Sequence, residues 1–131
     1  MEDSQKQNKE VCLYFQTRDE LTKVNIQKVV YFEADGNYTK VFFVNGCNIL
    51  ILTSLTNIEK LLDETLVNKV HPFIRIGKRY VINTHYIFNL NVVRQKMVLT
   101  DCVHSVVYTL CISKEALKKI KQLFVENKLW K

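Results

Sequence analysis

Residues 73–83 combine two short apolar segments with a basic break between them, and this pattern constrains the fold more than any other part of the sequence. Apolar and polar residues alternate before Gly77, which is the period of a half-buried strand. Gly77 allows a turn with positive φ, and Lys78 and Arg79 follow it directly. An apolar, β-branched run then precedes the polar residues 83–85. The segment predicts two strands that hold two cations at a turn, although an ordinary hairpin with solvated charges has the same pattern.

The other strand-like segments are also short and are separated by turn-forming residues. Asp35, Gly36 and Asn37 predict a tight turn within a hairpin, with Lys40 near its tip. The segments predicted as strands outside residues 73–83 are 11–16, 21–24, 29–34, 38–44, 47–53, 86–93, 96–100 and 106–112. No strand–helix–strand alternation and no repeat of fixed period occurs, so the chain is expected to be mainly β.

Two segments change to a helical period. Ser54 or Thr53 can cap the first helix, and Ser113 can cap the second. Their apolar stripes are Leu55, Ile58, Leu61 and Leu62 in the first and Ala116, Leu117, Ile120, Leu123 and Phe124 in the second. Asn25 can cap a single helical turn at residues 26–28. We expect a single mainly β domain of short antiparallel sheets with two small helices over residues 11–131, after a flexible tail at 1–10.

Length and composition fit one such domain, because 131 residues with 47% hydrophobic content can form a core and exclude a disordered chain. No apolar run approaches the ~20 residues of a membrane span. The first ten residues are polar where a signal peptide would be apolar. We therefore expect a cytoplasmic protein without a membrane partner.

No motif for catalysis or for metal binding is found in the sequence. It contains neither a Gly-x-Ser-x-Gly elbow nor a Gly-x-x-x-x-Gly-Lys loop, so we expect no enzyme and no cofactor. The cysteines are spaced too widely for a metal knuckle, and their place in or beside strands predicts buried, reduced thiols. The histidines have no ligand-spaced partner and are expected in turns. These residues are Cys12, Cys47, Cys102, Cys111, His71, His85 and His104.

Charge is distributed unevenly along the chain. Residues 1–70 contain eight Lys and Arg against ten Asp and Glu, a net charge of −2, whereas residues 71–131 contain eleven against three, a net charge of +8. Such an asymmetry favours a polyanionic partner, with nucleic acid as the first candidate and an anionic membrane surface as the second.

Four blocks of the sequence, residues 29–39, 52–55, 73–83 and 112–114, resemble in the same order the motifs of LytTR-type DNA-binding domains. These domains are the output modules of many bacterial response regulators, and the resemblance spans roughly residues 26–124. It implies an elongated fold of short β-sheets and small helices whose loops enter successive major grooves on one face of a DNA duplex. The loops implied are residues 37–40, 77–79 and 113–114.

The cations of these loops also fit a footprint that crosses two grooves, because duplex DNA offers dense rows of phosphates. Ser113 at a helix N-terminus adds free amides for a phosphate. A plain N-cap is the favoured interpretation of this residue, and both roles can hold together. The candidate DNA-binding residues are Asn37, Thr39, Lys40, Arg75, Lys78, Arg79, Ser113, Lys114 and Lys118. Asn83 is interpreted as the anchor of a turn, and Tyr31, Phe32, Phe42 and Phe43 as core residues rather than base-stacking platforms.

The sequence departs from the family pattern, which often has His, Ser and Arg at the positions of Gly77, Arg79 and Lys114. Lys114 lacks the planar fork of arginine, whereas Arg79 can donate two hydrogen bonds to guanine O6 and N7. We therefore interpret Arg79 as the residue that recognises a base and Lys78 as a phosphate contact. The resemblance itself places a base contact at or next to Lys78.

The resulting hypothesis is sequence-specific binding of double-stranded DNA by a bacterial transcriptional regulator. Only about 25 residues precede the matching region, so a receiver domain of ~100 residues is not expected within this chain, which would be a stand-alone regulator or an excised output domain. A homodimer on repeated half-sites is compatible with this hypothesis. The alternative is a module that binds RNA or an acidic protein.

Overall fold

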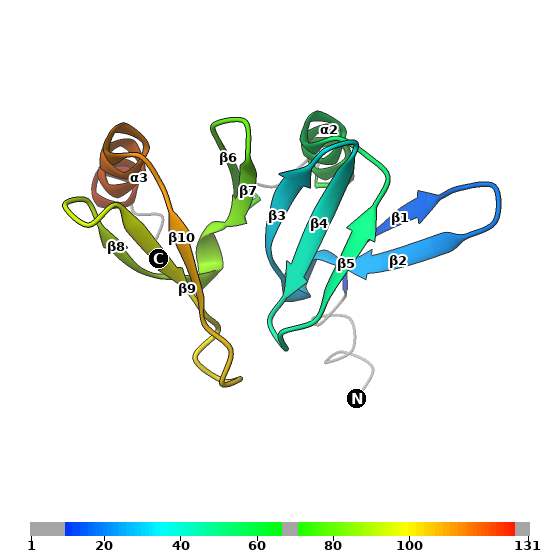
Figure 1. Cartoon of the computed structure of the whole chain (residues 1–131), viewed down its shortest axis with the longest axis horizontal. Helices are drawn as coiled ribbons and strands as arrows, with labels where there is room; N and C mark the ends of the chain where they lie inside the picture. The colour runs from blue at the N-terminus through cyan, green and yellow to red at the C-terminus, as the bar shows by residue number, and fades with distance from the viewer. Residues whose placement is uncertain (1–9, 67–70, 128–131) are drawn as a thin grey trace.

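The computed structural model describes residues 10–66 and 71–127, which form mainly short β-strands in three sheets (Figure 1). The strands are β1 (Cys12–Gln16), β2 (Leu21–Asn25), β3 (Val29–Asp35), β4 (Tyr38–Phe43), β5 (Asn48–Ile51), β6 (Phe73–Ile76), β7 (Tyr80–Asn83), β8 (Ile87–Asn91), β9 (Lys96–Leu99) and β10 (Tyr108–Cys111). The helical elements are α2 (Leu55–Thr65), α3 (Lys114–Asn127) and the single turns η1 (Ile26–Lys28) and η2 (Thr84–Tyr86). The predicted fold class is confirmed.

The central sheet has five antiparallel strands in the order β5-β4-β3-β7-β6. Two of its hairpins, β3–β4 and β6–β7, are those that the turn residues 35–37 and Gly77 predict. They join because β3 pairs with β7, with Glu33 opposite Tyr80. This pairing brings the β3–β4 turn and the β6–β7 turn to the same end of the sheet.

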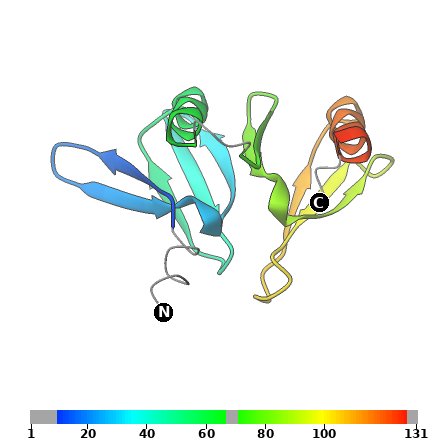
Figure 2. The ribbon, with the colours of Figure 1, turned by 180° about the vertical axis from the view of Figure 1, so that it is seen from behind.

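The two faces of the central sheet pack against different parts of the chain. One face packs against α2 and the β1–β2 hairpin and forms a first core cluster with them. The fully buried residues of this cluster include Phe32, Val41 and Val81 on the sheet and Ile58 and Leu62 on α2. The other face packs against the three-stranded sheet β10-β9-β8 and α3. The buried residues of this second cluster include Tyr31, Ile82, Met97, Leu99, Leu117 and Ile120. Figure 2 shows the same arrangement from behind, with each helix beside its own sheet.

Local hydrogen bonds explain where the helical segments begin. The Oγ of Ser54 accepts a hydrogen bond from Asn57 N at 3.1 Å. Ser54, one of the two residues predicted to cap this helix, is therefore the N-cap of α2. Asn25 caps η1 in the same way, its Oδ1 accepting from Gln27 N at 3.0 Å. Asn83 is 2% exposed and anchors the turn after β7, as predicted, because its Nδ2 donates to the Val29 carbonyl at 2.9 Å.

Four aromatic side chains pack between the central sheet and the three-stranded sheet. Tyr31 stacks on Phe42 with ring centroids 4.3 Å apart and meets Tyr80 and Tyr108 edge-on. Burial is the main cause that raises the pKa of Tyr31. Tyr31 and Phe32 are buried, and Phe42 and Phe43 pack against the two core clusters, so the interpretation of these four residues as core rather than as base-stacking platforms is confirmed.

The prediction of buried thiols was wrong. Cys47, Cys102 and Cys111 are exposed and Cys12 is partly buried, although all four are free. Cys111 lies in a strand but on its outward side, between the buried Leu110 and Ile112. Strand alternation gives an apolar run an exposed side as well as a buried one. Residues 1–9 of the tail predicted at 1–10 lie outside the described residues, as do residues 67–70 and 128–131.

Candidate nucleic-acid interface

The β3–β4 turn, the β6–β7 turn and helix α3 lie along one long edge of the molecule, the upper edge in Figure 1, and the β8–β9 turn lies at the left end of this view. Two main-chain hydrogen bonds hold them together in pairs. Ala34 N donates to the Arg79 carbonyl at 2.9 Å, joining the end of β3 to the β6–β7 turn. Ile112 N donates to the Gln95 carbonyl at 3.1 Å, joining the start of α3 to the β8–β9 turn. The loops implied by the resemblance are therefore on one edge.

The β6–β7 turn has the backbone that the sequence predicts, with φ of 60° at Gly77. Lys78 is exposed, and its ammonium makes no ion pair with any residue that the structure describes. Arg79 donates from Nε and Nη2 to Oε2 of Glu33, at 2.9 and 2.8 Å. This hydrogen bond is the main cause that raises the pKa of Arg79. The two adjacent cations thus differ, one unpaired and one held by a carboxylate.

Arg75 belongs to the same hairpin but lies on the α2 face of the sheet. Its Nη1 donates to Oε1 of Glu59 at 2.7 Å, and its Nε donates to the Gly77 carbonyl at 2.8 Å. The Arg75 side chain is 27% exposed. Its guanidinium therefore stabilises the β6–β7 turn. Arg75 was predicted to contact DNA together with Lys78 and Arg79, but it is more buried than these two residues and lies on the other face of the sheet.

The β3–β4 turn separates the three residues predicted to act together there. Asn37 is exposed at the turn. Lys40 is half-buried, with Nζ 5.9 Å from the centroid of the Phe42 ring. Thr39 is 0% exposed, and its Oγ1 donates to the Thr53 carbonyl at 2.8 Å. The assignment of Thr39 to a DNA contact is corrected, because alternation along β4 turns this side chain toward the α2 core.

The start of α3 presents a capped helix end beside exposed lysines. The Oγ of Ser113 accepts from Ala116 N at 3.2 Å, which confirms the predicted N-cap. Lys114, the first helical residue, and Lys118, one turn further on, are both exposed. A cation is disfavoured at a helix N-terminus, by typically ~0.3–1 kcal/mol, because it faces the positive end of the macrodipole. Lys114 therefore raises the positive potential of this helix end at a cost to the helix.

The β8–β9 turn, which holds the start of α3, was not predicted from the sequence as part of the interface. Arg94 and Lys96 are exposed, and they flank Gln95, whose carbonyl holds the start of α3. Lys96 Nζ lies 3.1 Å from Sγ of Cys111. The only available signal was the excess of positive charge after residue 70, because a pairing between residues 95 and 112 has no local sequence motif.

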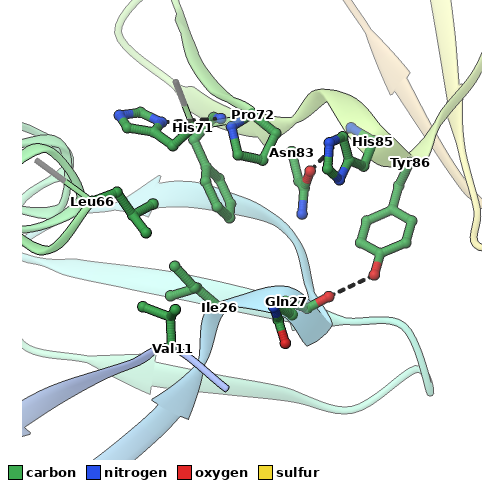
Figure 3. A pocket seen from close by; sticks show the side chains of 10 residues that line it. Val11, Ile26, Gln27, Leu66, His71, Pro72, Asn83, His85 and Tyr86 are labelled. Carbon is green, nitrogen blue, oxygen red and sulfur yellow. Dashed lines mark hydrogen bonds between the residues drawn. The ribbon is translucent and has the colours of Figure 1, made fainter. Parts of the chain in front are cut away.

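A separate apolar hollow of about 390 Å³ lies at the other end of the β6–β7 hairpin (Figure 3). Among the described residues, no lysine or arginine lines it. Its polar groups already hold the fold, since Tyr86 Oη donates to the Gln27 carbonyl at 2.5 Å and His71 Nε2 lies 2.8 Å from Asp63 Oδ1. The described part of its lining therefore lacks the lysines and arginines of the turn edge.

Within residues 10–66 and 71–127, no group of three His, Cys, Asp or Glu side chains could hold a metal ion. No helix in the described part of the chain is long and apolar enough to cross a membrane.

Cationic turns along one edge of short antiparallel sheets are the arrangement expected of a nucleic-acid-binding module. The family model of the LytTr DNA-binding domain matches residues 19–125, so the chain belongs to the LytTR family of DNA-binding domains. This is a family of DNA-binding domains and not of enzymes.

A solved structure shows the same fold. It is the LytTr DNA-binding domain attributed to a methyl-accepting/DNA response regulator from Bacillus cereus, and it is 19% identical, with a TM-score of 0.58. The match covers 88% of this chain and 98% of that domain. No curated protein matches the sequence.

Proposed function

We propose that this LytTR domain binds double-stranded DNA sequence-specifically, as the DNA-binding part of a bacterial transcriptional regulator that acts in the cytoplasm. The observation that carries the proposal is the alignment of the β3–β4 turn, the β6–β7 turn and the α3 N-terminus on one edge (Figure 1). Loops along one edge can enter successive major grooves on one face of a duplex. The domain would extend over residues 11–131, as a separate regulator or as the output domain of a longer one.

The exposed residues of this edge divide by chemistry into two roles. Lys78, Lys114 and Lys118 carry flexible ammonium groups suited to phosphates. The half-buried Lys40 would approach the backbone beside the β3–β4 turn, and the free amides at Ser113 would supply an uncharged phosphate contact. Arg79 and Asn37 carry planar groups that can form paired hydrogen bonds with a purine edge in the major groove. We assign general affinity to the first set and sequence readout to the second.

Salt dependence of binding tests the proposal. If the edge neutralises ~5 to 8 phosphates, log affinity should fall with log salt concentration with a slope of roughly −4 to −7. A fluorescently labelled duplex titrated from low to physiological salt measures this slope, and a flat slope would contradict the proposal. RNA of the same sequence should compete poorly, because the deep, narrow major groove of A-form RNA excludes the loops. Equal competition would favour the RNA-binding alternative.

Assembly on DNA can be tested with the same protein. A homodimer on repeated half-sites requires cooperative binding to a duplex that carries two copies of the site, with spacing fixed by the helical repeat. Analytical ultracentrifugation with one-site and two-site duplexes measures the stoichiometry. Independent binding to the two half-sites would show that the domain acts as a monomer.

A further inference from the structure

Two carboxylates lie among the cations of the proposed DNA-binding edge. One hollow of about 450 Å³ between the β3–β4 and β6–β7 turns is lined by Glu33, Asp35, Lys40, Lys78 and Arg79. Of the two carboxylates, Glu33 is the one that accepts hydrogen bonds from Arg79. Glu33 is on β3, opposite Lys40 on β4 and opposite Tyr80 on β7. A negative charge at this place opposes attraction to phosphate, so its contact with Arg79 needs an explanation.

The hydrogen bonds use only one edge of the Arg79 guanidinium. Both bonds, from Nε and from Nη2, end on the same Oε2 of Glu33. Nε and Nη2 form the side edge of the planar group, whereas Nη1 and the second N–H of Nη2 form its end edge. The end edge makes no hydrogen bond to any described residue, and the Arg79 side chain is 67% exposed. Two parallel N–H donors therefore remain available for guanine O6 and N7.

We propose that Glu33 is a positioning residue that fixes the Arg79 guanidinium for recognition of guanine, and so determines the sequence specificity of this domain. The proposal rests on the proposed function, because it assumes that the edge meets a major groove. It assigns no contact with DNA to Glu33 itself.

The surroundings of the pair favour positioning over stabilisation. An exposed ion pair contributes little to folding stability, and the exposure of Arg79 makes a large contribution implausible on physical grounds. The anchor is rigid instead: Glu33 is 21% exposed in a central strand, and Ala34 N binds the Arg79 carbonyl at 2.9 Å. The guanidinium carbon of Arg79 also lies 5.4 Å from the centroid of the Tyr80 ring. A long side chain held in this way loses less freedom when it binds a base.

The negative charge has a second effect that acts in the same direction. Glu33 partly neutralises Arg79, so Arg79 attracts random DNA less strongly than a free cation would. Specificity is a difference between two affinities, and it rises when the affinity for the wrong partner falls. Glu33 thus raises the ratio of specific to random binding through geometry and through charge.

The test measures this ratio in the intact chain. A preferred duplex is first selected from a random-sequence library with the unmodified protein, and its affinity is compared with that of a scrambled duplex. Glu33→Ala should lower the ratio about 3- to 10-fold, which is part of the discrimination that a bidentate contact provides. Glu33→Gln keeps an acceptor oxygen and should restore part of the loss. Both variants should bind scrambled DNA slightly more tightly, because each removes one negative charge.

Glu59→Ala is the matched control, because Glu59 is paired with Arg75 on the other face of the sheet. It should leave the ratio unchanged. In an Arg79→Ala background, Glu33→Ala should no longer change the ratio. Denaturation midpoints confirm that each variant is folded. If Glu33→Ala does not fold, Glu33→Gln is used in its place.

The outcomes separate the two proposals. If no preferred duplex emerges from the library, or if the salt slope is flat, the proposed function fails. If Arg79→Ala lowers the ratio but neither Glu33 variant does, the function stands and the positioning role is overturned. A rise in affinity for both duplexes by the same factor would show that Glu33 acts only as a repulsive charge, which also overturns the positioning role.

Discussion

The two faces of the central sheet each contain an arginine paired with a glutamate, but the exposures of the partners are reversed. On the α2 face, Arg75 is 27% exposed and Glu59 39%. On the other face, Arg79 is 67% exposed and Glu33 21%. In the first pair the cation is the more buried partner and also binds the Gly77 carbonyl, so it supports the turn. In the second pair the cation is presented to solvent. The same pair of residue types therefore supports a turn on one face and presents a cation to solvent on the other.

The helices on the two faces differ in the same sense. Helix α2 contains one lysine against three acidic residues, whereas α3 contains four lysines against two glutamates. Both helices pack through fully buried residues, such as Ile58 on α2 and Leu117 on α3. A polyanion should therefore be attracted toward the α3 side of the edge and not toward the α2 side.

The largest expected effect concerns what the two faces share. Ile58→Ala and Leu117→Ala each remove a fully buried side chain and should each lower the free energy of unfolding by ~2 to 4 kcal/mol. Urea denaturation followed by circular dichroism measures both. Each variant should show a single transition, because the faces share the strands of one sheet. An unchanged midpoint for Leu117→Ala would show that α3 is not docked on the rest of the domain, and that the two helices do not stabilise the two faces in the same way.

The next effect should distinguish the two arginines. Arg79→Ala should cost ~1 to 3 kcal/mol of binding free energy on the selected duplex and much less on scrambled DNA, since it removes a base contact. Arg75→Ala should lower stability and leave the ratio of the two affinities nearly unchanged. Fluorescence anisotropy with both duplexes measures this. A greater loss of specificity from Arg75→Ala would reverse the roles assigned to the two faces.

The sequence predicted the elements of this fold well because most of their signals are local. Gly77, the serine caps and the alternation in β3 and β4 all act within a few residues. The pairing of β3 with β7 has no such signal, and it decides that Arg79 meets Glu33. Thr39 is buried because α2 covers its side of β4. The alternation along β4 does not reveal which side of the strand a helix covers. The site was therefore predicted as a set of loops, while the partners of its charges required the tertiary structure.

A smaller effect is expected from Thr39, whose buried side chain lies on the α2 face of the sheet. Thr39→Val removes the hydroxyl that binds the Thr53 carbonyl and should destabilise the domain by about 1 kcal/mol. The salt slope of DNA binding should not change, because no phosphate contact is lost. Denaturation and a salt titration of the same variant measure both quantities. A reduced slope at unchanged stability would return Thr39 to the DNA-binding set.

The smallest effect is expected from Lys78, and it tests whether exposure or pairing marks the residue that recognises a base. Lys78 is exposed with an unpaired ammonium, whereas its neighbour Arg79 is held by Glu33. Lys78→Ala should weaken binding to selected and scrambled DNA about equally and lower the salt slope by about one, as expected for one lost phosphate contact. The family resemblance favours the opposite outcome, because it places a base contact at or next to Lys78. If Lys78→Ala loses specificity while Arg79→Ala loses only general affinity, the fixed guanidinium is not the group that recognises the base. The β6–β7 turn would then recognise the DNA sequence through Lys78, and Glu33 would only restrain Arg79 as a phosphate contact.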